Sequence, residues 1–151
     1  MRMKRVAASV AVFGALVWGL GTAPTNKPAP VFPDGLRWAS PPGNPAVQGA
    51  WVVGSERNAG PYLFRVKMAA GGRIPPHTHP DERSTTVLEG TIFVGFGETF
   101  DEAKGVAIPA GAVYVAPSNV AHYVWAKEAA VYQEAGAGPT ATAFIKRSSS
   151  D

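Results

Sequence analysis

The hydrophobic positions of this chain fall into short runs that are separated by turn-forming Gly, Pro and Asn. The runs are rich in Val, Ile, Phe, Tyr and Thr, which favour strands, and the closely spaced Gly and Pro exclude long helices. The pattern predicts an all-β domain of many short strands. The strands are expected at residues 36–38, 50–55, 62–69, 74–79, 84–88, 91–96, 113–115, 121–125, 130–133 and 141–145.

The strand expected at residues 62–69 shows the clearest alternation of polar and apolar side chains. One of its faces carries the cations Arg65 and Lys67, and the other carries Phe64, Val66 and Met68. A shift of one residue would bury both cations, so we expect the apolar face to point inward.

Residues 1–23 have the pattern of a signal peptide or N-terminal membrane anchor. A basic start, residues 1–5, precedes an uncharged and mostly apolar run at residues 6–20. We expect residues 24–33 to be a Pro-rich linker, 34–147 a single folded domain and 148–151 a disordered tail. The protein is then periplasmic or secreted, or membrane-anchored if the N-terminal segment is not cleaved.

Charge and cysteine content narrow the classes of function. The chain has 14 Lys and Arg against 11 Asp and Glu among its 151 residues. Arg2, Lys4 and Arg5 lie in the N-terminal segment, which has no acidic residue, so the remainder carries 11 charges of each sign. The remainder of the chain therefore has no excess of positive charge that would indicate nucleic-acid binding. Because there is no cysteine, disulfides, thiol catalysis and thiolate metal ligands are excluded.

The three histidines of the chain are the candidates for chemistry. His77 and His79 are two residues apart in a predicted strand, so their imidazoles point to the same face. A lone histidine is more often a polar residue with satisfied hydrogen bonds. The His-x-His pair together with His122, however, suits a shared metal ion, because imidazole is a common ligand of Zn, Fe, Cu and Ni.

The segment around the histidine pair resembles the first motif of the cupin family. That motif runs Gly-x5-His-x-His-x3/4-Glu-x6-Gly. Here Gly71 precedes His77 by six residues, His79 follows, and Gly90 closes the next hairpin.

The segment around the third histidine resembles the second cupin motif, Gly-x5-Pro-x-Gly-x2-His-x3-Asn. The matching positions are Gly111, Pro117, Asn119 and His122. The resemblance covers about residues 34–147, and it extends to a group of small exported bacterial cupins related to the cupin domain of ChrR-type anti-sigma factors. It implies a cupin double-stranded β-helix, or jelly-roll barrel, that holds one divalent transition metal ion (Zn, Fe, Mn or Ni).

Three positions depart from these motifs. Asn119 replaces a Gly, but Asn accepts a positive φ better than most residues, so the turn is retained. Ala126 replaces the final Asn and removes a polar group from the barrel. Arg83 stands where the first motif has Glu.

The Arg83 departure bears on the ligand set. A guanidinium about 5 Å from a divalent ion is repelled by roughly 7 kcal/mol at an effective dielectric constant of ~20. A one-residue bulge between His79 and Ser84 would turn Arg83 outward and Glu82 inward. The expected metal ligands are therefore His77, His79, Glu82 and His122. Two alternatives stay open: a three-histidine site with Arg83 facing an anionic substrate, and a decayed site with both charges in solvent.

Neighbouring positions of the last strands are expected to face opposite ways. Tyr123 and Trp125 lie at odd distances from His122, so they should face away from the metal and pack on the outside. Of Tyr132 and Gln133, at most one lines the cavity.

Two classes of function remain open at this point. The first is a mononuclear metal enzyme, dioxygenase-like or isomerase-like, that acts on a small molecule at open coordination positions. The alternative is a non-catalytic module that binds or senses a metal or a small ligand. No catalytic residue is assigned, because the motifs supply no general base. Membrane contact is expected only through the N-terminal segment, and a homodimer is left open.

Overall fold

The computed structural model describes residues 30–146. The expected signal segment, most of the expected linker and the expected tail lie outside the described residues. The compact unit that contains all the strands begins at Val31. Across residues 30–146, no helix combines the length and the apolar character that crossing a membrane requires.

The described part is built from ten strands and two short 3₁₀ helices. In chain order they are η1 Pro33–Gly35, β1 Val47–Val53, β2 Gly60–Met68, β3 Arg73–Thr78, β4 Arg83–Glu89, β5 Thr91–Phe96, η2 Glu102–Lys104, β6 Val106–Pro109, β7 Val113–Ala116, β8 His122–Trp125, β9 Ala130–Gly138 and β10 Ala143–Phe144.

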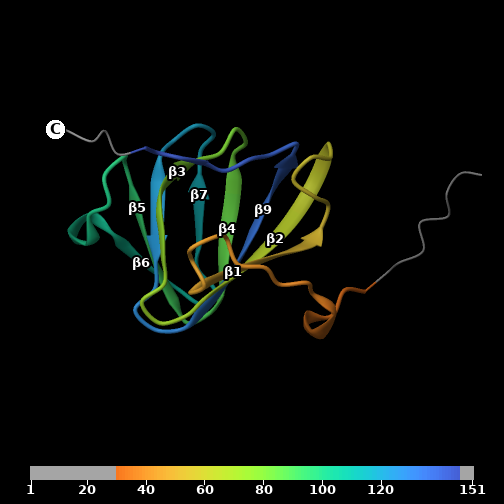
Figure 1. Cartoon of the computed structure of the whole chain (residues 1–151), viewed down its shortest axis with the longest axis horizontal. Helices are drawn as coiled ribbons and strands as arrows, with labels where there is room; N and C mark the ends of the chain where they lie inside the picture. The colour runs from red at the N-terminus through yellow and green to blue at the C-terminus, as the bar shows by residue number, and fades with distance from the viewer. Residues whose placement is uncertain (1–29, 147–151) are drawn as a thin grey trace, which may run out of the picture. The chain divides into compact units, whose positions relative to one another are not determined.

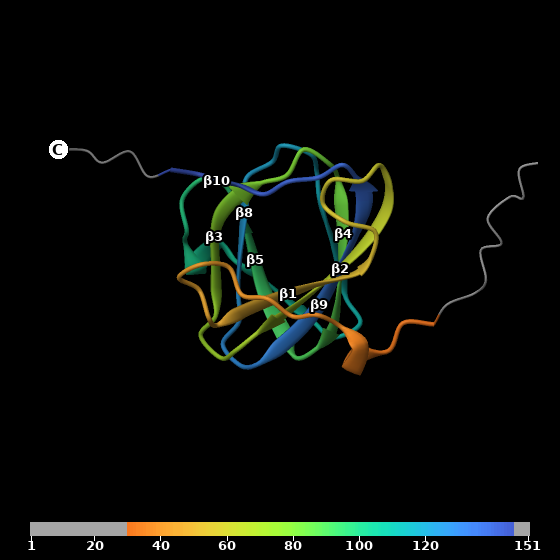
Figure 2. The same cartoon turned by 45° about the vertical axis from the view of Figure 1, so that its right-hand side comes forward.

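The strands form two five-stranded sheets in which every paired neighbour is antiparallel. The first sheet has the order β1-β2-β9-β4-β7, and the second has the order β10-β3-β8-β5-β6. Figures 1 and 2 show the two sheets facing each other across a common interior. This jelly-roll barrel confirms the predicted all-β fold.

The observed strands differ from the predicted ones at a few places. β6 was not predicted, because its four residues show no clear alternation. β9 continues to Gly138 rather than ending at residue 133, although glycine is a poor strand former. The short strand expected at residues 36–38 is absent, and Ala39 makes an isolated bridge to Gly49 instead.

The interior between the sheets is apolar over most of its length. Val66 and Met68 are buried, as the alternation in β2 predicts, while Lys67 is exposed and Arg65 donates to Gln133 on the outer face. The buried core cluster consists of Val47, Val66, Met68, Val87, Ile92, Val94, Ile108, Val124, Ala126, Ala130 and Tyr132.

The outer face of β8 is covered by an aromatic cluster rather than by solvent. Tyr123 and Trp125 alternate with the inward-facing His122 and Val124, as predicted, but their exposed fractions are only 0% and 3%. Phe100 lies over both rings, with centroids at 4.9 and 5.3 Å. This cluster holds β8, and with it His122, from the outside of the barrel.

The cluster predicts a sensitive position in β5. A Cβ added at Gly95 would overlap the ring of Tyr123, its partner in the β5–β8 ladder. We expect Gly95→Ala to lower the free energy of unfolding by about 1–3 kcal/mol, because a buried ring must move. Gly35→Ala is the control, since an added Cβ there meets nothing within 4 Å. Urea denaturation of both variants checks this, and equal stabilities would contradict the packing.

Candidate metal centre

His77, His79 and His122 converge in the barrel interior. Their ligand nitrogens lie within 4.8 Å of one another, and all three side chains are buried. His77 lies in β3 and His79 directly follows it, while His122 begins β8 and pairs with His77 across the ladder. The convergence expected from the motif spacing is therefore present.

A bulge in β3 aims His77 into the barrel. Ile74 pairs with Val124 and His77 pairs with His122, so β3 has one more residue than β8 between these two pairs. The residues in the bulge are prolines, which have no N–H to donate to a ladder. The carbonyl of Pro75 lies 2.8 Å from Nδ1 of His77. The bulge thus supplies the carbonyl acceptor that holds the orientation of the His77 ring.

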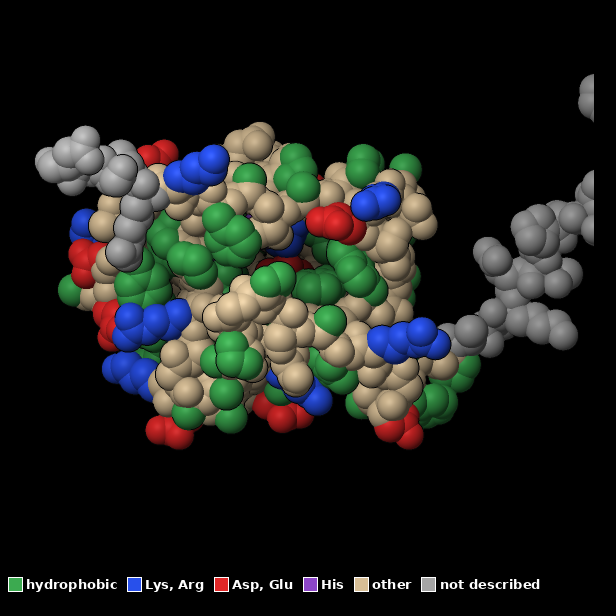
Figure 3. Space-filling view, in the orientation of Figure 1, with side chains coloured by type: hydrophobic (Ala, Val, Ile, Leu, Met, Phe, Trp, Pro, Cys, Tyr) green, Lys and Arg blue, Asp and Glu red, His purple; other side chains and the backbone are tan. Residues whose placement is uncertain are grey.

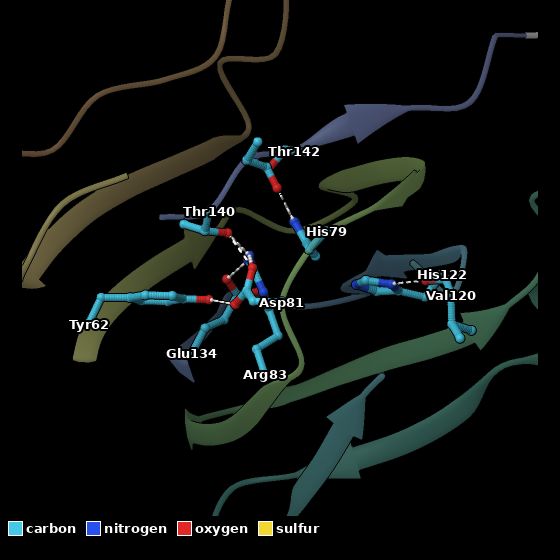
Figure 4. Close-up of polar contacts among 10 residues, drawn as sticks. Tyr62, His79, Asp81, Arg83, Val120, His122, Glu134, Thr140 and Thr142 are labelled. Carbon is cyan, nitrogen blue, oxygen red and sulfur yellow. Dashed lines mark hydrogen bonds and ion pairs between the residues drawn. The ribbon is translucent and has the colours of Figure 1, made fainter. Parts of the chain in front are cut away.

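Backbone carbonyls orient the other two rings in the same way. Nδ1 of His79 lies 2.8 Å from the carbonyl oxygen of Ala141, and Nδ1 of His122 lies 3.1 Å from that of Val120 (Figure 4). A carbonyl can only accept, so Nδ1 carries the proton and Nε2 keeps its lone pair. Within residues 30–146, the buried Nε2 of His79 has no hydrogen-bond partner.

Burial keeps the three imidazoles neutral. It lowers the pKa of His77 to about 3, with help from the neighbouring His122. It lowers the pKa of His79 to about 4, with help from the charge of Arg83. The pKa of His122 is also lowered, chiefly by burial. Three neutral imidazoles with free Nε2 atoms are a donor set that fits one divalent transition metal ion.

The turn before β8 ties the third histidine to the other two. Asn119 has a φ of 61°, which confirms that Asn adopts the left-handed conformation expected at this motif position. Its N–H donates to the carbonyl oxygen of His79 at 2.7 Å. The turn therefore fixes the end of β3 relative to the start of β8.

Arg83 and Glu82 have the opposite orientation from the one expected. Arg83 is 5% exposed, and Glu82 is exposed to solvent. Arg83 begins β4, where the buried residues Thr85 and Val87 continue the same inward face. The expectation that Arg83 turns outward is wrong, and Glu82 does not belong to the group of convergent ligands.

Two carboxylates explain why Arg83 can face inward. Its Nη1 donates to Glu134 Oε2 at 2.8 Å, and its Nη2 donates to Asp81 Oδ1 at 3.1 Å and to Thr140 Oγ1 at 2.7 Å. Tyr62 donates to Asp81 Oδ2 at 2.5 Å (Figure 4). Compensating negative charge comes from Asp81, two residues before Arg83, and from Glu134 in β9, and it offsets the repulsion expected for the guanidinium alone.

The two carboxyl groups differ in their electrostatics. Burial alone would raise the pKa of Asp81, but hydrogen bonds from Thr140 and Tyr62 and the charge of Arg83 hold it below its ordinary value. Burial raises the pKa of Glu134 above its ordinary value, although Arg83 opposes this. Asp81 is therefore an ionised partner of Arg83, and Glu134 is the group more ready to hold a proton.

The sequence contained a signal for one of the missed residues. Tyr132 lines the cavity, so Glu134, two residues later, shares its face once the strand is extended past Gln133. Asp81 and Thr140 lie outside the strands, and no local pattern marks them.

A cavity of about 840 Å³ borders the candidate metal centre. Figure 3 shows the surface hollowed on one face, with apolar side chains around the opening and atoms of both charges in its depth. His77, His79, Arg83 and Glu134 line the cavity together with apolar side chains such as Phe64. Two of the three histidines and the Arg83–Glu134 pair thus border the same space.

Comparison with known proteins agrees with this arrangement. Residues 64–132 match the family described as a Cupin domain, so the chain contains a cupin domain and the resemblance noted in the sequence is confirmed at this level. Among solved structures, the polyketide cyclase RemF from Streptomyces resistomycificus is similar, with a TM-score of 0.68 and 15% identity over 82% of this chain and 89% of that one. At this identity the likeness concerns the fold.

Plant germin-like proteins are similar in sequence. The chain is 38% identical over 64 residues to germin-like protein subfamily T member 2 of Arabidopsis thaliana, which is 42% of this chain and 29% of that protein. It is 38% identical over 85 residues to germin-like protein 1-1 of Oryza sativa subsp. japonica, or 54% of this chain and 35% of that protein. The chain spans about a third of the length of these relatives.

The charged network predicts a stability difference between adjacent residues. Arg83→Met would leave Asp81 and Glu134 buried without their cation, and we expect it to lower the free energy of unfolding by about 3–5 kcal/mol. The neighbouring Glu82→Gln alters an exposed side chain and should change stability by less than about 0.5 kcal/mol. Urea denaturation with a chelator present measures both. Similar losses in the two variants would contradict the network.

Proposed function

We propose that this cupin-domain chain is a metal-dependent enzyme that acts on a small molecule. The observation that carries the proposal is the convergence of three neutral imidazoles at a cavity whose wall also holds Arg83 and Glu134. An enzyme needs a polar group near the open side of its metal, and this is what separates it from a module that only binds.

The proposed ligands of the ion are His77, His79 and His122. Three protein ligands leave coordination positions free for a substrate. When bound, the ion supplies Lewis-acid chemistry, or redox chemistry if it is iron or manganese. The carbonyls behind the three rings keep each Nε2 aimed at a common point, so the chain itself provides the preorganisation.

Glu134 is the residue that we propose as proton donor or acceptor. Its Oε2 accepts the hydrogen bond from Arg83, and burial raises its pKa above the ordinary value of a carboxyl, which favours a role in proton exchange. It lines the same cavity as His77 and His79. Arg83 holds the carboxyl in place and is a positioning residue.

We also propose that the protein works outside the cytoplasm. The basic and apolar pattern of residues 1–23 supports this, together with the resemblance to small exported bacterial cupins. Expression of the full chain in a Gram-negative host, followed by N-terminal sequencing, tests the proposal. A start beyond residue 20 in the periplasmic fraction would support it, and a start at Met1 in the cytosol would contradict it.

Metal analysis and calorimetry test the ligand set. We expect the untagged protein to bind one equivalent of a divalent transition metal ion. His77→Ala, His79→Ala and His122→Ala should each weaken binding by at least about 100-fold, because an imidazole ligand is lost. Glu82→Gln is the matched control and should bind metal like the wild type, since Glu82 is exposed.

Three outcomes would change the proposal. A wild-type protein that binds no transition metal would overturn it. Weaker binding by Glu82→Gln would restore Glu82 as the fourth ligand. Full metal binding with no turnover of any small molecule would favour the binding or sensing module.

A further inference from the structure

We propose that the part of the cavity beside Arg83 is a subsite for a flat, uncharged aromatic group, and that Asp81 and Glu134 exclude carboxylates from it. The inference rests on the proposed function, because it names the chemical class that the site would take. It replaces the earlier alternative in which Arg83 faces an anionic substrate.

The guanidinium has no free edge for a carboxylate. A carboxylate binds Arg in two-point fashion, either across Nη1 and Nη2 or across Nε and Nη2, and both edges need a free hydrogen on Nη2. The two hydrogens of Nη2 are taken by Asp81 and Thr140. Glu134 already occupies Nη1. Protein oxygens thus already occupy the guanidinium edges through which arginine would bind a carboxylate at two points.

The charges around the subsite do not favour an anion either. Arg83 forms ion pairs with both Asp81 and Glu134, at 3.1 and 2.8 Å, so its charge is already compensated by the protein. Glu56 lines the same pocket, but it is exposed to solvent, which screens its charge. Arg37 also lines the larger cavity, but it is exposed to solvent.

The Nε edge of the guanidinium is closed as well. Within the described residues, Nε of Arg83 is buried and has no hydrogen-bond partner. A molecule in the cavity does not reach this donor, so a carboxylate would lose its hydration there without gaining a hydrogen bond from Nε.

Aromatic side chains form a wall next to Arg83. A pocket of about 170 Å³ is lined by Arg83 and by Trp51, Tyr62 and Phe64, and it shares lining residues with the larger cavity. The Trp51 ring lies 5.5 Å from that of Tyr62 and 4.8 Å from that of Phe64. A cavity of about 150 Å³ is enough for a benzene molecule. The space therefore suits one flat ring.

The subsite lies beside the candidate metal centre. Figure 4 shows Arg83 and its carboxylate partners between Tyr62 on one side and His79 and His122 on the other. A molecule with its ring against the aromatic wall would extend towards the three imidazoles, which fits the larger cavity that both sets of residues line.

The test uses the full-length protein in the presence of a chelator, so that no metal contributes to binding. Phenol, benzamide and benzoate are titrated separately, and binding is followed by tryptophan fluorescence and by NMR of the protein. We expect phenol and benzamide to bind at least about tenfold more tightly than benzoate. Benzamide and benzoate have nearly the same shape, so their comparison isolates the charge.

Charge-removing variants sharpen the test. Asp81→Asn and Glu134→Gln should each shift the ratio of benzamide to benzoate affinity by about tenfold towards benzoate, because Arg83 then carries uncompensated charge. Glu56→Gln is the matched control, since it removes a carboxylate of the same pocket that is not paired with Arg83, and it should leave the ratio within about twofold.

Several results would overturn the inference. They are tighter binding of benzoate than of benzamide by the wild type, no binding of any of the three probes, or an equal shift in Glu56→Gln. If a variant fails to fold, the benzamide and benzoate comparison in the wild type decides alone. If the separate calorimetry showed no metal binding, the proposed function would be wrong, but the comparison of benzamide with benzoate would still test the subsite.

Discussion

The buried pairing of Arg83 with Glu134 and Asp81 constrains the rest of the barrel. Taking an ion out of water costs several kcal/mol, so these three side chains must be held together wherever they are buried. β4 and β9 achieve this through their ladder, in which Arg83 pairs with Gly136. A Cβ at Gly136 would lie 2.5 Å from the hydroxyl of Tyr62 and 2.6 Å from a carboxylate oxygen of Asp81, so the glycine leaves the room that the network needs.

The same short segment serves both the charged network and the candidate metal centre. Thr140 accepts from Arg83, while the carbonyl of Ala141, one residue later, anchors the ring of His79. The segment leads into β10, which pairs with β3 at His77. A shift of residues 140–144 would therefore disturb two imidazoles and the guanidinium together, which links the position of the charges to the geometry of the ligands.

The sequence was sufficient for the fold and for the histidines, because both depend on local spacing. Alternation in β2 and the two motif spacings act over a few residues, and they placed Val66, Met68 and the three rings correctly. The orientation of Arg83 depended on Glu134, which is 51 residues away along the chain. No local pattern reports such a partner, so electrostatic repulsion estimated for Arg83 alone gives the wrong orientation.

The carbonyl-anchored imidazoles have a consequence for metal selection. Three neutral nitrogen ligands add no negative charge, so an ion held there would keep its full positive charge and act as a stronger electrophile than one with a carboxylate ligand. A nitrogen set of this kind follows the Irving–Williams order, in which copper(II) binds more tightly than zinc, iron or manganese. The identity of the bound ion would then depend on which metals are available in the compartment where the barrel folds.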